Sequence, residues 1–132
     1  MAARGQLHHL ELWVGAARTD DGPWSWLLTR LGYERESTWA SGASWRLGSA
    51  YVVLESGRDH ERGRAERRRS GMNHVAFWAG TCDDVDVLTA DAPAHGWTLL
   101  FPHAYPFAGG TGHYAAYLEC AEGLEVELVA DG

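Results

Sequence analysis

Two histidines, His9 and His74, lie in short apolar segments of similar sequence, LHHLELWVG and MNHVAFWAG. Aligning these segments pairs the two histidines and also pairs Trp13 with Trp78, both at a spacing of 65 residues. A single histidine in a strand is most often a hydrogen-bonded core residue. Two histidines at matched positions of a repeat instead predict a shared role, and imidazole is the most common metal ligand among side chains.

Carboxylates occur in the segments AYVVLES and LEVELVA, which end the two halves of the chain. Alternate residues of a strand share a face, so Glu55 and Glu127 are predicted to face the same concavity as the histidines. Glu127 has apolar neighbours on both sides, where a charge is costly unless it is paired or bound to a metal. Imidazole and carboxylate together suit a divalent ion such as Zn, Ni, Mn or Fe(II) with open coordination positions.

The elements that must position these residues start with a strand at residues 9–14. The segment RTDDGPWSWLLTRLGY then predicts a short helix that starts near Asp20 or Asp21, has Pro23 in its first turn and ends at Gly32. Glycine-containing turns separate three strands that are predicted at residues 33–39, 44–48 and 50–56. These segments form one βαβββ unit.

The second half of the chain repeats this order. A strand at residues 72–80 precedes a helix whose start is predicted from a capping box of Thr81 and Asp84. The apolar face of this helix is predicted to consist of Val85, Leu88 and Ala92. Three further strands are predicted at residues 97–101, 113–119 and 124–130.

The chain is therefore predicted to be one α+β domain, residues 1–132, made of two βαβββ modules. The modules extend over about residues 6–57 and 71–130, and their sheets are expected to form a half-open barrel around a central cavity. Residues 58–70 join them and contain six of the eleven arginines. Because this stretch mixes charges without apolar periodicity, a solvated linker or surface hairpin is favoured over an anion-binding patch.

Composition excludes several classes of partner. The formal net charge of −7 argues against nucleic acid, because binding phosphate requires a basic surface. The two cysteines lie in unrelated contexts and indicate neither a disulfide framework nor a zinc ribbon. No segment approaches the roughly 18 apolar residues that span a bilayer, so we expect a cytoplasmic protein without a membrane partner.

These features resemble the vicinal oxygen chelate superfamily, which includes glyoxalase I, extradiol dioxygenases, methylmalonyl-CoA epimerase and the fosfomycin- and bleomycin-resistance proteins. The resemblance covers about residues 6–130 and depends on the segments LHHLELWV, MNHVAFWAG and AEGLEVELVA. Cys120 and Ala121 replace the Asp-Pro that usually begins the turn before the last strand. The resemblance implies a metal site with four ligand positions, His9, Glu55, His74 and Glu127.

The resemblance also implies a function, namely a divalent-metal-dependent lyase or isomerase whose small substrate binds the metal through adjacent oxygens. Glu55 is expected to shuttle a proton in such a reaction. An extradiol dioxygenase, with Fe(II), two histidines and one glutamate, ranks second because proteins of that class usually have more βαβββ units. Family members commonly pair as homodimers, and we expect the same here.

The alternative from another class is a non-catalytic protein of the bleomycin-resistance type, which binds a cationic ligand in an aromatic, acidic groove. The net charge and the seven tryptophans are compatible with it. Those proteins do not keep the metal ligands, so the presence of two histidines and a glutamate here favours metal chemistry.

Aromatic residues are expected to line the cavity. Trp13, Tyr51 and Trp78 have the parity to contact an apolar substrate, although tryptophans in a small domain are more often core residues. The glycine-rich loop at residues 102–114 lacks a phosphate-binding motif and is predicted to be a mobile lip. His103, His113 and Tyr114 in this loop are candidate substrate contacts.

Overall fold

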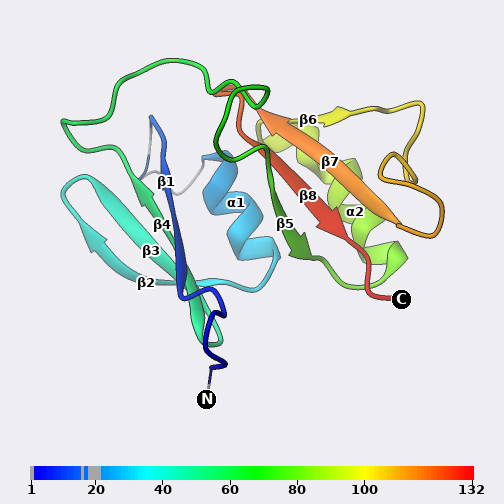
Figure 1. The fold of residues 1–132 in the computed structure, drawn as a ribbon, viewed down its shortest axis with the longest axis horizontal. Helices are drawn as coiled ribbons and strands as arrows, with labels where there is room; N and C mark the ends of the chain where they lie inside the picture. Colours follow the sequence, from blue (N-terminus) through cyan, green and yellow to red (C-terminus); the bar gives the residue numbers. More distant parts are fainter. Residues whose placement is uncertain (1, 16, 18–21) are drawn as a thin grey trace. The chain divides into compact units, whose positions relative to one another are not determined.

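The computed structural model describes residues 2–15, 17 and 22–132 (Figure 1). These residues form two compact units, unit 1 (residues 1–62) and unit 2 (residues 63–132). Each unit contains a four-stranded mixed sheet and one α-helix, in the order βαβββ. The predicted α+β class and the repeated module are therefore confirmed. A cavity shared by the two sheets stays a prediction, because each unit is described by itself.

Unit 1 has the strand order β1-β4-β3-β2, with β1 parallel to β4 and the other neighbours antiparallel. Its elements are β1 His9–Trp13, α1 Pro23–Arg30, β2 Glu34–Trp39, β3 Gly42–Leu47 and β4 Ala50–Glu55. Gly22 is the N-cap residue of α1 and gives no side-chain hydrogen bond, while Pro23 occupies the first turn as predicted. The predicted helix start at Asp20 or Asp21 lies outside the described residues.

Unit 2 repeats this topology, with the strand order β5-β8-β7-β6 and β5 parallel to β8. Its elements are β5 Val75–Trp78, α2 Cys82–Asp91, the 3₁₀ helix η1 Ala92–His95, β6 Trp97–Leu100, β7 Ala115–Cys120 and β8 Glu125–Val129. The predicted capping box is present, because the Thr81 hydroxyl accepts from the Asp84 amide at 3.1 Å and the Asp84 carboxylate accepts from the Thr81 amide at 2.9 Å. Helix α2 packs against β7 (Figure 1).

Burial follows the predicted alternation of the strands. In β1, Leu12 is buried whereas His9 and Trp13 are exposed. In β5, Ala76 and Trp78 are likewise exposed. The first strand of each unit thus presents its histidine side away from the apolar core, where a ligand can reach it. Among the described residues, no helix has the length and apolar character required to cross a bilayer.

Candidate functional site

A cavity of about 590 Å³ lies in unit 2 against β5, β7 and β8. It is lined by Ala76, Phe77, Trp78, Gly109, His113, Tyr117, Glu127 and Val129. Its titratable lining groups are one carboxylate, one imidazole and one phenol, and the other side chains are apolar. Trp78 is 73% exposed, an unusual degree for a tryptophan, and it offers a large apolar surface to a ligand.

Glu127 is a buried carboxylate in the wall of this cavity. Its residue exposure is only 6%, yet one carboxylate oxygen lies 3.0 Å from His74 Nε2 and the other contacts His113 Nε2. Burial, and then the charge of Glu127 and a hydrogen bond to it, raise the pKa of Tyr117. The Tyr117 hydroxyl thus belongs to the same hydrogen-bonded group as Glu127.

His74 has an acceptor next to each ring nitrogen. Its Nδ1 lies 2.7 Å from Asn73 Oδ1, and its Nε2 lies 3.0 Å from Glu127 Oε1. The orientation of the Asn73 amide is assigned by its nitrogen, which donates to the Arg67 carbonyl at 2.9 Å. Nδ1 therefore carries a proton. The space between Nε2 and the Glu127 carboxylate favours a positive charge, which can be a proton or a metal cation.

Part of the arginine-rich segment, residues 58–70, contacts strands β7 and β8 of unit 2. The Arg67 guanidinium lies 2.7 Å from a carboxylate oxygen of Glu125, whose residue exposure is 2%. Arg64 contacts Glu119 and also donates to the Ala121 carbonyl at 3.0 Å. The second half of the segment is therefore held against β7 and β8 by ion pairs instead of being entirely solvated.

Gly109 lies where any side chain would collide with the site. A Cβ atom at this position would be 2.4 Å from the Tyr117 hydroxyl oxygen and 2.8 Å from a carbon of the His113 ring. The glycine thus lets the loop before β7 approach the cavity closely, and His113 can reach Glu127 because of that approach.

His9 in unit 1 belongs to a row of stacked side chains, two rings and one guanidinium, that crosses three strands. The register places His9 opposite Tyr51 and Tyr51 opposite Arg46. The His9 and Tyr51 rings stack with centroids 4.9 Å apart, and the Arg46 guanidinium carbon lies 4.9 Å from the Tyr51 centroid. His9 Nδ1 is also 2.9 Å from Nδ1 of His8. Tyr51, predicted as a substrate contact, therefore also orients His9.

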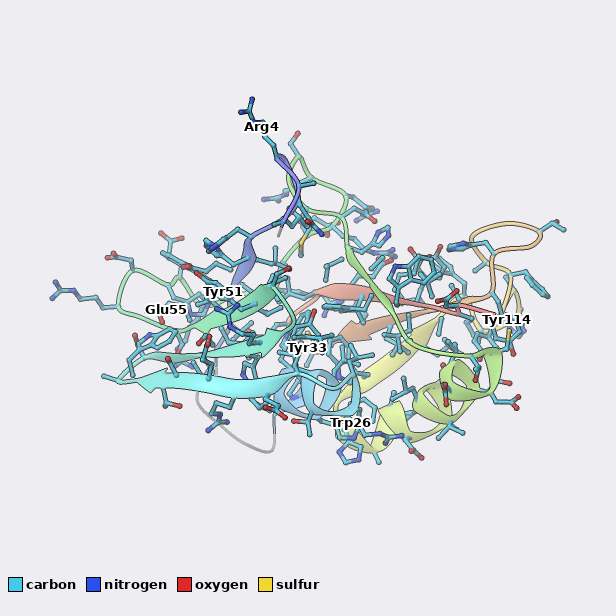
Figure 2. The ribbon with its side chains drawn as sticks, turned by 90° about the horizontal axis from the view of Figure 1, so that it is seen from below. Arg4, Trp26, Tyr33, Tyr51, Glu55 and Tyr114 are labelled. Atoms are coloured by element: carbon cyan, nitrogen blue, oxygen red, sulfur yellow. The ribbon has the colours of Figure 1, made fainter. Side chains whose placement is uncertain are left out.

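Glu55 is the last residue of β4, four residues after Tyr51, and Figure 2 labels both side chains. Its carboxylate accepts a hydrogen bond from Trp39 Nε1 at 2.8 Å and another from Ser41 Oγ at 2.7 Å. These bonds tie the end of β4 to the β2–β3 hairpin, so Glu55 has a clear structural role.

The strand registers show which residues of the two units correspond. Trp13 lies opposite Glu55 in unit 1, and Trp78 lies opposite Val129 in unit 2. Because the two tryptophans are matched positions of the repeat, Glu55 is the counterpart of Val129.

Glu127 therefore has a different counterpart. It lies opposite Ala76, and the residue of unit 1 in the same register position is Val53, which lies opposite Glu11. Glu55 and Glu127 therefore do not occupy matching register positions of the repeat, and their predicted meeting at one metal site stays a prediction. Glu55 shares a face with Val53 but lies two residues farther along the strand.

The other predicted substrate contacts have distinct surroundings. Trp78 and His113 line the unit 2 cavity. Trp13 is 48% exposed and donates from Nε1 to Glu11 at 2.7 Å. The Tyr114 hydroxyl donates to Asp86 on α2 at 2.6 Å, and Figure 2 labels this residue in unit 2.

The carboxylate of Asp86 on α2 anchors the loop at residues 101–114. Asp86 accepts hydrogen bonds from the hydroxyls of both Tyr105 and Tyr114, and these bonds lower its pKa. The loop also forms turns of its own, including a bond from the Ala115 amide to the Pro106 carbonyl at 2.9 Å. The loop that the sequence predicts as a mobile lip thus has defined anchors.

Replacing Asp86 with alanine is expected to speed amide hydrogen exchange throughout residues 104–115, because both tyrosines lose their acceptor. Asp83→Ala, an exposed carboxylate removed from the same helix, is the control and should leave the loop unchanged. Since the folded state lowers the pKa of Asp86, the anchor is present above the ordinary aspartate pKa and is lost as the pH falls through the lowered value. Equal exchange in both variants would contradict this role.

The described residues contain no group of three or more His, Cys, Asp or Glu side chains arranged to hold a metal ion. His74 and Glu127 form a pair of donors, and His113 approaches the other oxygen of the same carboxylate. A complete site would need further ligands, for which the sequence predicts His9 and Glu55. Because the units are described separately, the meeting of His9 with His74 stays a prediction.

Residues 8–117 match the Glyoxalase/Bleomycin resistance protein/Dioxygenase superfamily. This match includes most of the chain, and the repeated βαβββ units agree with it, so the protein belongs to this superfamily. The resemblance identified in the sequence is confirmed.

Individual relatives support the assignment. "Uncharacterized protein YqjT" of Bacillus subtilis (strain 168) is 38% identical over 125 residues, which cover 94% of this chain and 98% of that protein. The crystal structure of a candidate glyoxalase from Bacillus halodurans is 36% identical, with a TM-score of 0.87 and 97% of each chain covered. Lactoylglutathione lyase from Agrobacterium tumefaciens is 18% identical, with a TM-score of 0.62 over 98% of this chain and 96% of that chain, a likeness of fold alone.

Proposed function

We propose that the protein is a divalent-metal-dependent enzyme of the lyase or isomerase type, acting on a small substrate that binds the metal through adjacent oxygens. The observation that carries the proposal is the His74–Glu127 pair, with Nε2 and Oε1 3.0 Å apart at a cavity in a glyoxalase-superfamily fold. His74 and Glu127, with His9 from unit 1, are the residues that would hold the ion.

The donor atoms of unit 2 fit a divalent ion. Imidazole and carboxylate suit Zn, Ni, Mn or Fe(II), and the proton on His74 Nδ1 leaves Nε2 as the coordinating nitrogen. When bound, the ion supplies a Lewis acid that stabilises negative charge on a substrate oxygen.

The cavity walls suggest how the rest of a substrate is bound. Ala76, Trp78 and Val129 form an apolar surface that excludes water and suits an apolar group. Tyr117 lines the same cavity and contributes its ring and its hydroxyl to the wall. These contacts orient the substrate, and orientation lowers the entropic cost of the reaction.

Glu55 is our candidate for the residue that shuttles the proton, as the sequence predicts, but without a role as a ligand of the metal. Its counterpart Val129 lines the cavity of unit 2, so the repeat places Glu55 at the corresponding position of the sheet in unit 1. Because Val53 occupies the position that mirrors Glu127, we propose that Glu55 is a base and not the mirror ligand. His113, which lines the cavity, is the second candidate for this role.

Val53 also favours a second candidate function. With an apolar residue mirroring Glu127, the ligand set reduces to two histidines and one carboxylate, which is typical of Fe(II) oxygenases. An oxygen-dependent reaction on a chelating substrate is therefore the alternative. Oxygen uptake that requires Fe(II) and that zinc cannot support would favour it over the lyase or isomerase.

Acetohydroxamate, a chelator with two adjacent oxygens, distinguishes the proposed enzyme from a binding protein. We expect it to bind the metal-loaded protein and to lose its affinity when the metal is removed. Tetraphenylphosphonium, a hydrophobic cation, should bind weakly if at all. Tight binding of this cation without metal, together with no metal-dependent binding of acetohydroxamate, would contradict the proposal. The predicted homodimer and cytoplasmic location remain proposals.

A further inference from the structure

We propose that Asn73 and Arg67, which lie outside the predicted ligand set, position the His74 imidazole so that its Nε2 atom is available to a metal ion. The inference rests on the proposed function and adds two positioning residues to it. Asn73 acts through a hydrogen bond to the ring, and Arg67 acts through a buried ion pair next to the ring.

The Asn73 side chain is fixed at both ends. Its nitrogen donates to the Arg67 carbonyl at 2.9 Å, so its oxygen is the atom that faces His74 Nδ1 at 2.7 Å. An oxygen acceptor at this distance holds a proton on Nδ1. A ligating histidine usually donates its other N–H to a carbonyl or carboxylate, and Asn73 provides that acceptor here.

Without Asn73, the ring has a competing arrangement. A neutral imidazole can instead carry its proton on Nε2 and donate it to Glu127, which lies 3.0 Å away. That arrangement satisfies both side chains with one hydrogen bond, and it occupies both of the atoms that would coordinate the metal. Asn73 therefore favours the tautomer in which Nε2 and Glu127 can bind a metal over the tautomer in which they are hydrogen-bonded to each other.

Arg67 acts on the same ring from the side of Glu125. A carboxylate oxygen of Glu125 lies 3.9 Å from His74 Nδ1, and the Arg67 guanidinium lies 2.7 Å from the other oxygen. Glu125 is almost fully buried, so its charge would attract the Nδ1 proton if it had no other partner. The guanidinium keeps Glu125 in its own ion pair and leaves Asn73 as the partner of Nδ1.

Asn73 is well suited to experiment, because it is the only asparagine in the sequence. Selective ¹⁵N-asparagine labelling gives a single side-chain amide signal, and ¹⁵N-histidine labelling reports the tautomer of each ring. His74→Gln assigns the His74 ring signals. Cobalt(II) titration of the full chain, followed by absorption, measures metal affinity without a substrate.

Asn73→Leu is expected to reduce cobalt affinity about 10- to 100-fold, the range for losing a partner of a ligating histidine. The His74 ring should change from the Nδ1–H to the Nε2–H tautomer. Asn73→Asp, which keeps an oxygen acceptor, should retain cobalt affinity within about tenfold of the natural protein. Circular dichroism checks that each variant is folded.

Wild-type cobalt affinity and an unchanged tautomer in folded Asn73→Leu would overturn the role of Asn73. For Arg67, the matched control is Arg68→Gln, which removes an 84% exposed guanidinium from the adjacent position. Arg67→Gln should weaken cobalt binding and Arg68→Gln should not; equal effects would overturn the role of Arg67. If the natural protein binds no metal but its tautomer still depends on Asn73, the proposed function fails while the positioning role holds.

Discussion

Replacing Glu127 with glutamine is expected to reduce the affinity for a divalent metal by about 100-fold or more, while the protein still folds. The substitution keeps the size of the side chain and its contacts with His74 and His113 but removes the charge of the candidate ligand. Because loss of an outer partner of a ligand alone costs about 10- to 100-fold, loss of the ligand should cost at least as much. Zinc competition with a coloured chelator measures the change.

Glu55→Gln is the matched control, since it makes the same chemical change in the closing strand of the other unit. The Glu55 carboxylate is held by Trp39 and Ser41, and its register position differs from that of Glu127. We expect zinc affinity to stay near that of the natural protein. A loss as large as that of Glu127→Gln would show that Glu55 is a ligand after all.

Replacing Arg67 with methionine is expected to lower the free energy of unfolding by about 3 kcal/mol, which corresponds to a fall in Tm of roughly 10 °C. The substitution leaves the buried Glu125 carboxylate without its guanidinium partner. The Arg67 side chain is itself 31% exposed, so the loss should fall at the lower end of the range for broken buried pairs. Urea unfolding measures it.

Two further variants separate the ion pair from general effects of losing an arginine. Arg68→Met removes an arginine that pairs with Glu66 at the surface, and it should change stability by less than about 0.5 kcal/mol. The double change Arg67→Met with Glu125→Gln removes both charges and should recover much of the stability. If the double variant is as unstable as Arg67→Met, burial of an unpaired Glu125 is not the cause.

The order of elements could be predicted because each one has a local signal in the sequence. The pairing of His9 with His74 located the repeat, and the capping box of Thr81 and Asp84 located the second helix. The alternation of side chains along a strand was enough to predict which face of β1 and of β5 each residue occupies. Apart from the repeat, which is found by comparing one half of the sequence with the other, these signals depend on residues that are close in sequence, which is why they could be read without coordinates.

The register of the sheets could not be predicted in the same way. Alternation correctly placed Glu55 on the same face as Val53, but it does not say which of them occupies the register position that corresponds to Glu127. That depends on how β4 pairs with β1 across about 40 residues of chain. A shift of two residues keeps every side chain on its face and changes which one mirrors Glu127.

The contacts around His74 were also hidden in the sequence. Arg67 belongs to a stretch that reads as solvated, yet it pairs with Glu125, which is 58 residues later in the chain. Asn73 has one available signal, since it is the only asparagine and directly precedes a candidate ligand. The contact of His113 with Glu127 depends on the path of a glycine-rich loop, which no periodicity describes.

We propose above that His74 and Glu127 are metal ligands. The most direct test is an anomalous difference map from crystals of the protein grown with zinc. A peak about 2.0–2.2 Å from both His74 Nε2 and a carboxylate oxygen of Glu127 is the predicted result. A fully occupied zinc ion bound elsewhere, with His74 and Glu127 still bonded to each other, would contradict the claim.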